Sequence, residues 1–189
     1  MRSSLFRGVL VVAACAVAGC GTPLPQTSAI MPLTTAGTPV LSDDGAIGFA
    51  SYALGSPGRT ANDPASAARA LASIDYLAGA LYENPHWIGF PAITKVQMVQ
   101  ARAEVRALLG VPADAPSQAV VDGLIGAATA LDGGDSKAAE AVLVAPTFSF
   151  GPQRTLAILD NLPPVPQADV AAQAANSWIT YGCNMQQSC

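Results

Sequence analysis

The sequence predicts an all-α protein, a compact bundle of five to six short, alanine-rich helices behind a flexible N-terminal tether. Apolar residues recur at positions i, i+3, i+4 and i+7 in successive windows, which is the pattern of helices with one buried face. Proline or glycine bounds these windows, and none of them shows the convincing alternation of a strand. Hydrophobic types make up 51% of the 189 residues, and much of this is alanine, so the helices can pack closely.

The charge pattern excludes two classes of partner. Charged residues make up only 12% of the chain, against roughly 25% in an average soluble domain, and the formal net charge is −4. The sequence contains two lysines, Lys95 and Lys137. We therefore expect no nucleic-acid partner, since that requires clustered basic side chains, and no polybasic patch for a membrane surface.

Residues 1–19 have the parts of a secretory signal peptide. Arg2 and Arg7 form a positive n-region, and residues 8–18 form an apolar run. This run is too short for the roughly 20 residues that span a bilayer as a helix. We interpret residues 1–19 as a signal peptide that is removed.

The run ends in Val17-Ala18-Gly19-Cys20, which resembles the lipobox of bacterial lipoproteins, and the resemblance covers only the first twenty residues. It implies that Cys20 receives a diacylglyceryl group, becomes the first mature residue and is acylated at its new amino end. Two or more acyl chains hold a protein firmly on a membrane. Gly21 in place of aspartate implies the periplasmic side of the outer membrane in a Gram-negative host, and otherwise the outer face of the cell membrane. The alternative is an ordinary signal peptide cut elsewhere.

Once Cys15 is removed with the signal peptide and Cys20 carries lipid, two cysteines remain. Cys183 and Cys189 would lie in an oxidising compartment, where an even pair predicts a disulfide. The five residues between them can bend to the roughly 5.5 Å Cα separation that a disulfide prefers. Two free thiols or an intermolecular bridge are the alternatives.

Residues 20–41 are expected to be a lipid-anchored tether. They carry no charge, contain several prolines and show no helical periodicity. As a random coil such a segment would span on the order of 25 Å.

Residues 42–61 are expected to hold a short helix and a turn. Ser42 is a good N-cap, with Asp43 and Asp44 in the first turn and a stop at Gly55. Alternation of apolar and polar residues at 47–51 would equally permit a short strand. Residues 55–59 (Gly-Ser-Pro-Gly-Arg) resemble a phosphate loop only superficially and are interpreted as a turn.

Residues 62–189 are expected to form the helical domain with its disulfide-closed tail. Asp63 and Pro64 begin the clearest helix, whose apolar stripe leaves Asp75 outside it. Arg102 and Arg106 are expected on the wet side of the second helix, and Trp178 and Tyr181 in the core. The expected helices cover residues 64–83, 92–109, 116–131, 136–144, 152–162 and 167–181.

The loop between the first two of these helices holds the candidate contact for a partner. His86, Trp87 and Phe90 lie between Pro85 and Pro91, and aromatic side chains on a stiff loop make good anchors. In the alternative, Trp87 and Phe90 plug the end of the bundle while His86 bonds a backbone carbonyl. The pattern favours burial, because aromatic side chains are mostly used for it.

No metal or cofactor site is predicted. Asp132, Asp135 and Glu140 are acids that calcium could use, but the spacing of an EF-hand is absent and helix caps explain the aspartates. No catalytic motif accompanies His86, the single histidine, so the sequence predicts no enzyme.

We therefore expect a lipid-anchored, non-catalytic adaptor that contacts another envelope protein or the cell wall. One alternative is a carrier or sensor of a small apolar ligand between helices, which needs a dry pocket of several hundred Å³. The other alternative is an enzyme that carries no motif we can identify.

Overall fold

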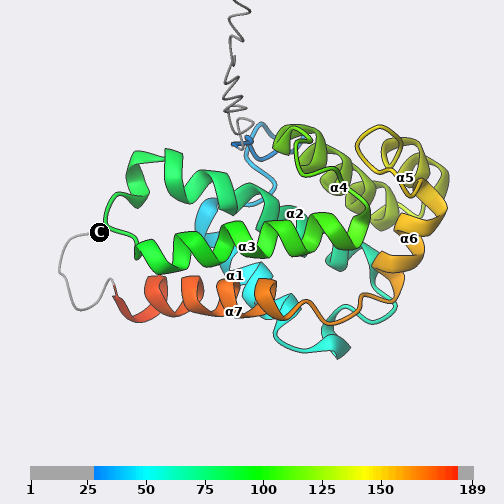
Figure 1. The fold of residues 1–189 in the computed structure, drawn as a ribbon. Coiled ribbons are helices and arrows are strands. Elements are labelled where there is room, and N and C mark those ends of the chain that lie inside the picture. Colours follow the sequence, from blue (N-terminus) through cyan, green and yellow to red (C-terminus); the bar gives the residue numbers. More distant parts are fainter. Residues whose placement is uncertain (1–27, 183–189) are drawn as a thin grey trace, which may run out of the picture.

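The computed structural model describes residues 28–182, and this part of the chain is an all-α bundle of seven helices (Figure 1). The predicted fold class is therefore confirmed. Two 3₁₀ turns, Pro57–Arg59 and Pro85–Trp87, and a π-helical turn, Trp178–Gly182, complete the helical structure. The helices are α1 (Asp43–Leu54), α2 (Pro64–Glu83), α3 (Ala92–Leu109), α4 (Ser117–Asp132), α5 (Ser136–Val142), α6 (Pro152–Asp160) and α7 (Pro166–Ser177).

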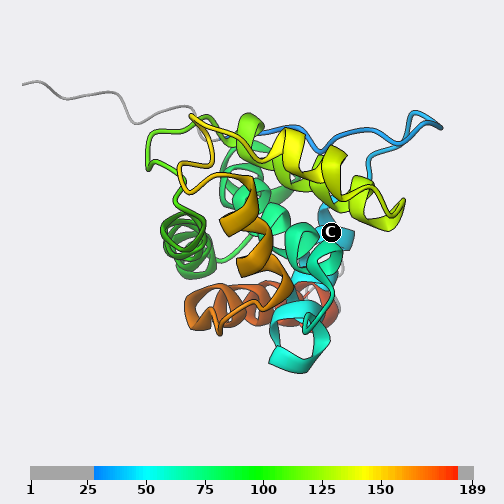
Figure 2. The same ribbon diagram turned by 90° about the vertical axis from the view of Figure 1, so that its right-hand side faces the viewer.

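Helix α2 forms the centre of the bundle, and α1, α3, α4 and α6 all pack against it. Helix α7 closes the side formed by α1 and α3, while α5 packs on α4 and α6 (Figures 1 and 2). Fifteen of the twenty residues of α2 are buried, and seven of these are alanine, so neighbouring helices can approach it from several sides. At its start, the Ser66 N–H donates to Asp63 Oδ1 at 2.9 Å, and this bond lowers the pKa of the Asp63 carboxyl.

Helix α1 settles the ambiguity between helix and strand at residues 42–54. The Ser42 hydroxyl accepts from the Gly45 N–H at 3.1 Å, as an N-cap should, and two acids occupy the first turn. Ile47 and Ala50 are completely buried between α2 and α7. Burial of this face outweighs the cost of about 1 kcal/mol for each glycine in the helix.

The described part of the expected tether packs on the domain. Ala29 and Met31 are buried in the core, so the folded part includes residues up to thirteen positions before residue 42, where the sequence analysis placed its start. Two buried side chains produce no periodicity, which explains why the uncharged segment looks like a linker. No helix between residues 28 and 182 combines the length and the apolar character needed to cross a bilayer.

Candidate functional site on the outward face of α3

The aromatic loop between α2 and α3 plugs the end of the bundle. Trp87 is 1% exposed and Phe90 4%, and their rings meet edge to face with centroids 5.3 Å apart. Trp178, directly after α7, packs on Phe90 with the two ring centroids 4.7 Å apart. The loop between α2 and α3 therefore contacts the end of the last helix. The two buried rings are therefore not an exposed contact for a partner, and only His86 of the expected trio lies at the surface. Its imidazole packs edge-on against Trp87 at 4.6 Å.

Asp43 fixes this plug to the first helix. Its carboxylate accepts from Trp87 Nε1 at 2.8 Å, from Asn84 Nδ2 at 3.0 Å and from the Tyr76 hydroxyl. Burial and the hydrogen bond to this carboxylate raise the pKa of Tyr76 above its usual range. The sequence analysis assigned Asp43 only to the first turn of a helix, because its three donors come from residues more than thirty positions away.

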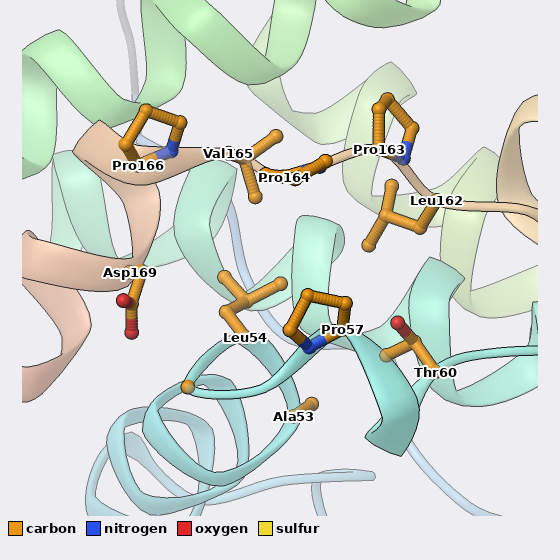
Figure 3. Close-up of a pocket in the computed structure, with 11 residues that line it drawn as sticks. Ala53, Leu54, Pro57, Thr60, Leu162, Pro163, Pro164, Val165, Pro166 and Asp169 are labelled. Carbon is orange, nitrogen blue, oxygen red and sulfur yellow. The ribbon is translucent and has the colours of Figure 1, made fainter.

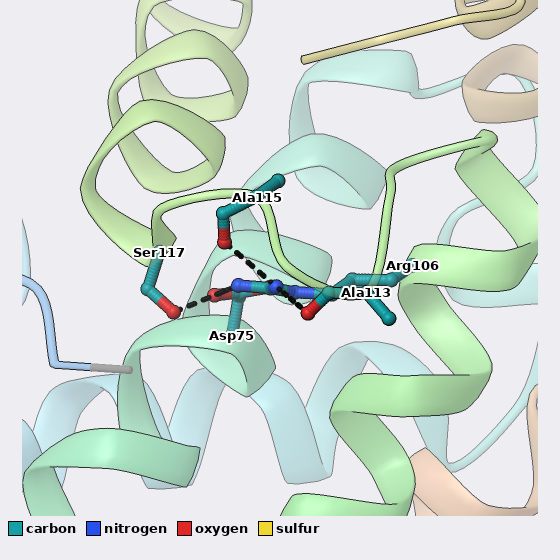
Figure 4. A network of polar contacts seen from close by, with 5 residues as sticks. All are labelled: Asp75, Arg106, Ala113, Ala115 and Ser117. Carbon is teal, nitrogen blue, oxygen red and sulfur yellow. Dashed lines mark hydrogen bonds and ion pairs between the residues drawn. The ribbon is translucent and has the colours of Figure 1, made fainter. Parts of the chain in front are cut away.

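A buried ion pair and its hydrogen bonds join α2, α3 and α4 at the centre of the bundle (Figure 4). Arg106 on α3 donates to both carboxylate oxygens of Asp75 on α2, from Nε at 2.7 Å and from Nη2 at 3.0 Å. Nη1 donates to the carbonyls of Ala113 (3.0 Å) and Ala115 (2.9 Å), and Nη2 also donates to Ser117 Oγ at 2.8 Å. All five N–H donors of the guanidinium are thus used inside the domain.

Arg102 lies one turn earlier on α3 and adds a second positive charge to this cluster. It is 9% exposed, and its pKa is lowered by burial, while Asp75 opposes that shift and Arg106 adds to it. One carboxylate thus faces two guanidinium groups. The expectation that Arg102 and Arg106 lie on the solvent side of α3 is wrong, because both side chains are buried, and Asp75, which lies off the apolar stripe, is buried as well. The available signal was an acid flanked by apolar residues in the middle of a helix, since a charge buried there needs a partner.

The outward side of α3 carries no charge over four helical turns. We call the α3 face the set formed by Ile93, Val96, Gln100, Ala103 and Ala107, which recur at helical spacing and are all exposed. Ile93 is 67% exposed and Val96 45%. Isolated apolar residues at a surface are ordinary, but a helix face with a single polar member is typical of an interaction surface.

The α3 face borders a groove with a volume of about 400 Å³. Its walls are mostly small and apolar, and Arg102 and Arg106 of the buried cluster also line it. It is a surface groove and not an enclosed cavity. The lining residues are Val99, Arg102, Ala103, Arg106, Ala107, Val111 and Ala113.

A second, smaller pocket of about 170 Å³ lies beside the proline-rich connection between α6 and α7 (Figure 3). Leu54 and Pro57 face Pro164 and Val165 across it, and Asp169 lies at one side. The neighbouring residues 55–59 contain the 3₁₀ turn Pro57–Arg59, consistent with the expected turn. The Arg59 guanidinium donates to the Tyr52 carbonyl at 2.6 Å and stacks on the Tyr52 ring, so it is bound within the domain.

The acids considered for calcium each have a separate partner. Asp135 caps α5 by accepting from the Ala138 N–H at 2.9 Å, Asp132 pairs with Arg69, and Glu140 accepts from Gln153 at 3.0 Å. Across residues 28–182, no group of three or more His, Cys, Asp or Glu side chains is arranged to hold a metal ion.

The remaining predicted positions divide between the described chain and its ends. Trp178 packs against the aromatic plug, whereas Tyr181 is exposed and not part of the core as expected. Cys20, Cys183 and Cys189 lie outside the described residues, and their lipidation and pairing stay predictions.

Comparison with models of protein families, with curated protein sequences and with solved structures finds no match to this chain.

Proposed function

We propose that this chain is a lipid-anchored cell-envelope protein whose helical domain is a non-catalytic interaction module. The observation that carries the proposal is the order of parts in the sequence. A positive n-region, a short apolar run and Val17-Ala18-Gly19-Cys20 precede a separately folded domain. The anchor would be acyl chains on Cys20, and Gly21 supports the outer membrane as the destination in a Gram-negative host.

The α3 face is the surface we propose for the partner, in place of the buried Trp87 and Phe90. Ile93 and Val96 offer aliphatic anchors, and the adjacent groove places the positive cluster of Arg102 and Arg106 beneath apolar walls. These aliphatic anchors on an uncharged helix face suit an amphipathic helix of another envelope protein. The cell wall is the other candidate partner.

The buried polar groups support a structural role for the domain. Arg106 uses all its donors on neighbouring helices, and Asp43 accepts from three side chains that fix α1 and the aromatic plug. Groups held in this way stabilise one arrangement of the bundle. The proposal therefore assigns them to folding and assigns contact with other molecules to the α3 face.

A carrier of a small ligand is the second candidate, and the groove volume of about 400 Å³ favours it. Ligand pockets commonly measure about 300–1,000 Å³. The groove is lined mainly by small apolar side chains, which suits an apolar molecule. This candidate uses the same surface, so one experiment separates it from the adaptor.

Replacement of the anchoring cysteine tests the proposed class of protein. We expect Cys20→Ser to abolish acylation and to move the protein from the membrane fraction to the soluble fraction or the medium. Intact mass measurement and fractionation give the result, and Cys15→Ser is the matched control that should leave both unchanged. If Cys20→Ser is still acylated and still sediments with membranes, the lipoprotein proposal is wrong.

Photo-crosslinking in the native envelope tests the surface. A photoreactive residue at position 93 or 96 should give one discrete adduct, which the added substitution Ala103→Asp should remove. The control is position 52, because Tyr52 is about as exposed but lies on α1. Equal labelling from all three positions would contradict the assignment of the α3 face. An adduct of small-molecule size would favour the carrier.

A further inference from the structure

We propose that residues 30–39 rest on the lipid bilayer and fix the orientation of the anchored domain. This inference depends on the proposed lipid anchor at Cys20 and adds to it a second, non-covalent contact with the membrane. It follows from how the segment is held, from which side chains it exposes and from its distance along the chain to the anchor.

The segment is held firmly where it joins the domain. Gln118 of α4 binds the backbone of Ile30 on both sides: the Ile30 N–H donates to Oε1 at 2.8 Å, and Nε2 donates to the Ile30 carbonyl at 3.0 Å. Ala29 and Met31 are buried in the core on either side of this residue. Ile30 therefore has a fixed position, and its side chain is the one that points away from the bundle.

The residues that follow form an ordered turn. Leu33 and Pro39 make an antiparallel bridge, the Val40 N–H donates to the Pro32 carbonyl at 2.8 Å, and Thr34 N–H donates to the Thr38 carbonyl at 2.7 Å. Gly37 closes the turn at φ 77°, which glycine adopts without strain. Figure 2 shows this segment, in blue, running along the upper edge of the bundle with its turn protruding beyond the helices.

The protruding segment is uncharged and presents aliphatic side chains to solvent. Ile30 is 76% exposed and Leu33 62%, and no charged residue occurs between positions 21 and 42. Contact with lipid therefore requires no charge to leave water. Because the turn is already ordered, contact also requires little further loss of conformational entropy.

The anchor keeps this segment near the bilayer. Eight residue-to-residue steps separate Cys20 from Ser28. Whatever their conformation, they cannot extend beyond about 28 Å. A contact so close to its own anchor forms at an effective concentration in the millimolar range. Each aliphatic side chain of this size favours an apolar phase by on the order of ten- to a hundredfold when fully buried, so insertion of Ile30 and Leu33 together favours the contact.

Tryptophan quenching in vesicles tests the proposal with the full, acylated protein. The vesicles contain zwitterionic phosphatidylcholine with brominated acyl chains, which quench a tryptophan that enters the apolar layer. We expect Leu33→Trp to be quenched at least threefold more than Tyr52→Trp, after subtraction of the signal of the parent protein. Tyr52 is a matched control because it is as exposed as Leu33. Its ring stacks with Arg59 of the turn Pro57–Arg59, and this turn lies at the opposite edge of the bundle in Figure 2.

A second pair of variants tests whether the native Leu33 side chain, and not the introduced tryptophan, causes the membrane contact. In an Ala36→Trp background, Leu33→Ser should reduce the quenching at least twofold. If acyl mass on Cys20 is present and neither Leu33→Trp nor Ala36→Trp is quenched above Tyr52→Trp, the membrane contact is refuted and the anchor stands. If acyl mass is absent, the anchor and the contact that depends on it are both refuted.

Discussion

Arg106 connects three helices through one planar group. It is 4% exposed, and its donors satisfy the buried carboxylate of Asp75, two carbonyls of the α3–α4 connection and the first residue of α4. A buried pair of this kind contributes little net stability relative to apolar residues of the same shape. Loss of one partner is different, because it leaves the other charge buried without compensation.

We therefore expect Arg106→Met to lower the free energy of unfolding by about 3–5 kcal/mol. The double substitution Asp75→Leu with Arg106→Met should recover part of that loss, since the Asp75 carboxylate is then no longer buried without its Arg106 partner. Urea titration followed by circular dichroism measures both. Arg154→Met is the control: Arg154 is exposed and stacks on Phe150, so the expected change is at most about 1 kcal/mol. A loss below about 1 kcal/mol for Arg106→Met would contradict this role.

Tyr76 gives the domain a dependence on alkaline pH. Its pKa is raised in the folded protein, by burial and by the hydrogen bond to Asp43, so the folded state retains the phenolic proton at a pH where the unfolded chain releases it. Stability from this group is complete below the unfolded pKa of about 10 and falls as pH rises above that value.

Tyr76→Phe should remove this alkaline loss. The variant is expected to be less stable than the parent at pH 8, because Asp43 loses a donor, and the difference should shrink as the pH rises towards 11. Chemical denaturation at several pH values measures it, and Tyr82→Phe, at an exposed tyrosine, is the control. A difference that is independent of pH would refute the explanation.

At the scale of elements, α4 shows how closely the bundle is packed. An added Cβ at Gly123 would lie 2.6 Å from Phe148 Cε2, and Phe148 is completely buried. At Gly126, one turn later, the nearest atom is a side-chain carbon of Val142 at 3.6 Å, which is an ordinary contact. The glycine at 123 is thus required by the segment after α5, whereas the glycine at 126 is not.

The two glycines predict opposite effects for the same substitution. Gly123→Ala should destabilise the protein by about 1–3 kcal/mol, because the ring of Phe148 has no space into which to move. Gly126→Ala should stabilise it by about 0.5–1 kcal/mol, since alanine favours the helix interior. Thermal unfolding of both variants gives the comparison. The packing of α4 would be wrongly described if Gly123→Ala were as stable as Gly126→Ala.

The predictable elements are those whose signals are local. The N-cap at Asp63, Pro64 and an unbroken apolar stripe define α2 without reference to the rest of the chain. Long-range burial decided the others. Ile47 makes residues 43–54 a helix by packing between α2 and α7, and Met31 draws the supposed tether onto the bundle. Met31 leaves no periodic pattern in the sequence, and Ile47 shares a helical face with Ala50 and Leu54 that alternation at residues 47–51 makes ambiguous.

The candidate site was less predictable than the fold. The sequence indicated the loop with Trp87 and Phe90, but it could not show that Trp178 would cover these rings from α7. The α3 face was hidden by the same limitation: Arg102 and Arg106 look like the wet side of a helix until Asp75 on α2 is placed beside them. Pairs far apart in sequence determine which side of α3 faces solvent.

Across the whole molecule, three regions would have three separate tasks. Cys20 would hold the protein on the membrane, residues 30–39 would orient the domain, and the α3 face would meet the partner. The oriented segment packs on α4, whereas the α3 face lies on a helix bound to α2 and α7. A contact with the bilayer through the first surface therefore leaves the second one open.

Native mass spectrometry of the protein, gently extracted from its own envelope, tests both the lipid anchor and the α3 face. We predict a polypeptide that begins at Cys20, carries acyl mass and retains a second polypeptide, which the variant Val96→Asp loses while keeping its acyl mass. A protein that retains residues 1–19 or lacks acyl mass would contradict the anchor. An acylated protein whose bound polypeptide is unaffected by Val96→Asp would contradict the α3 face as the contact surface.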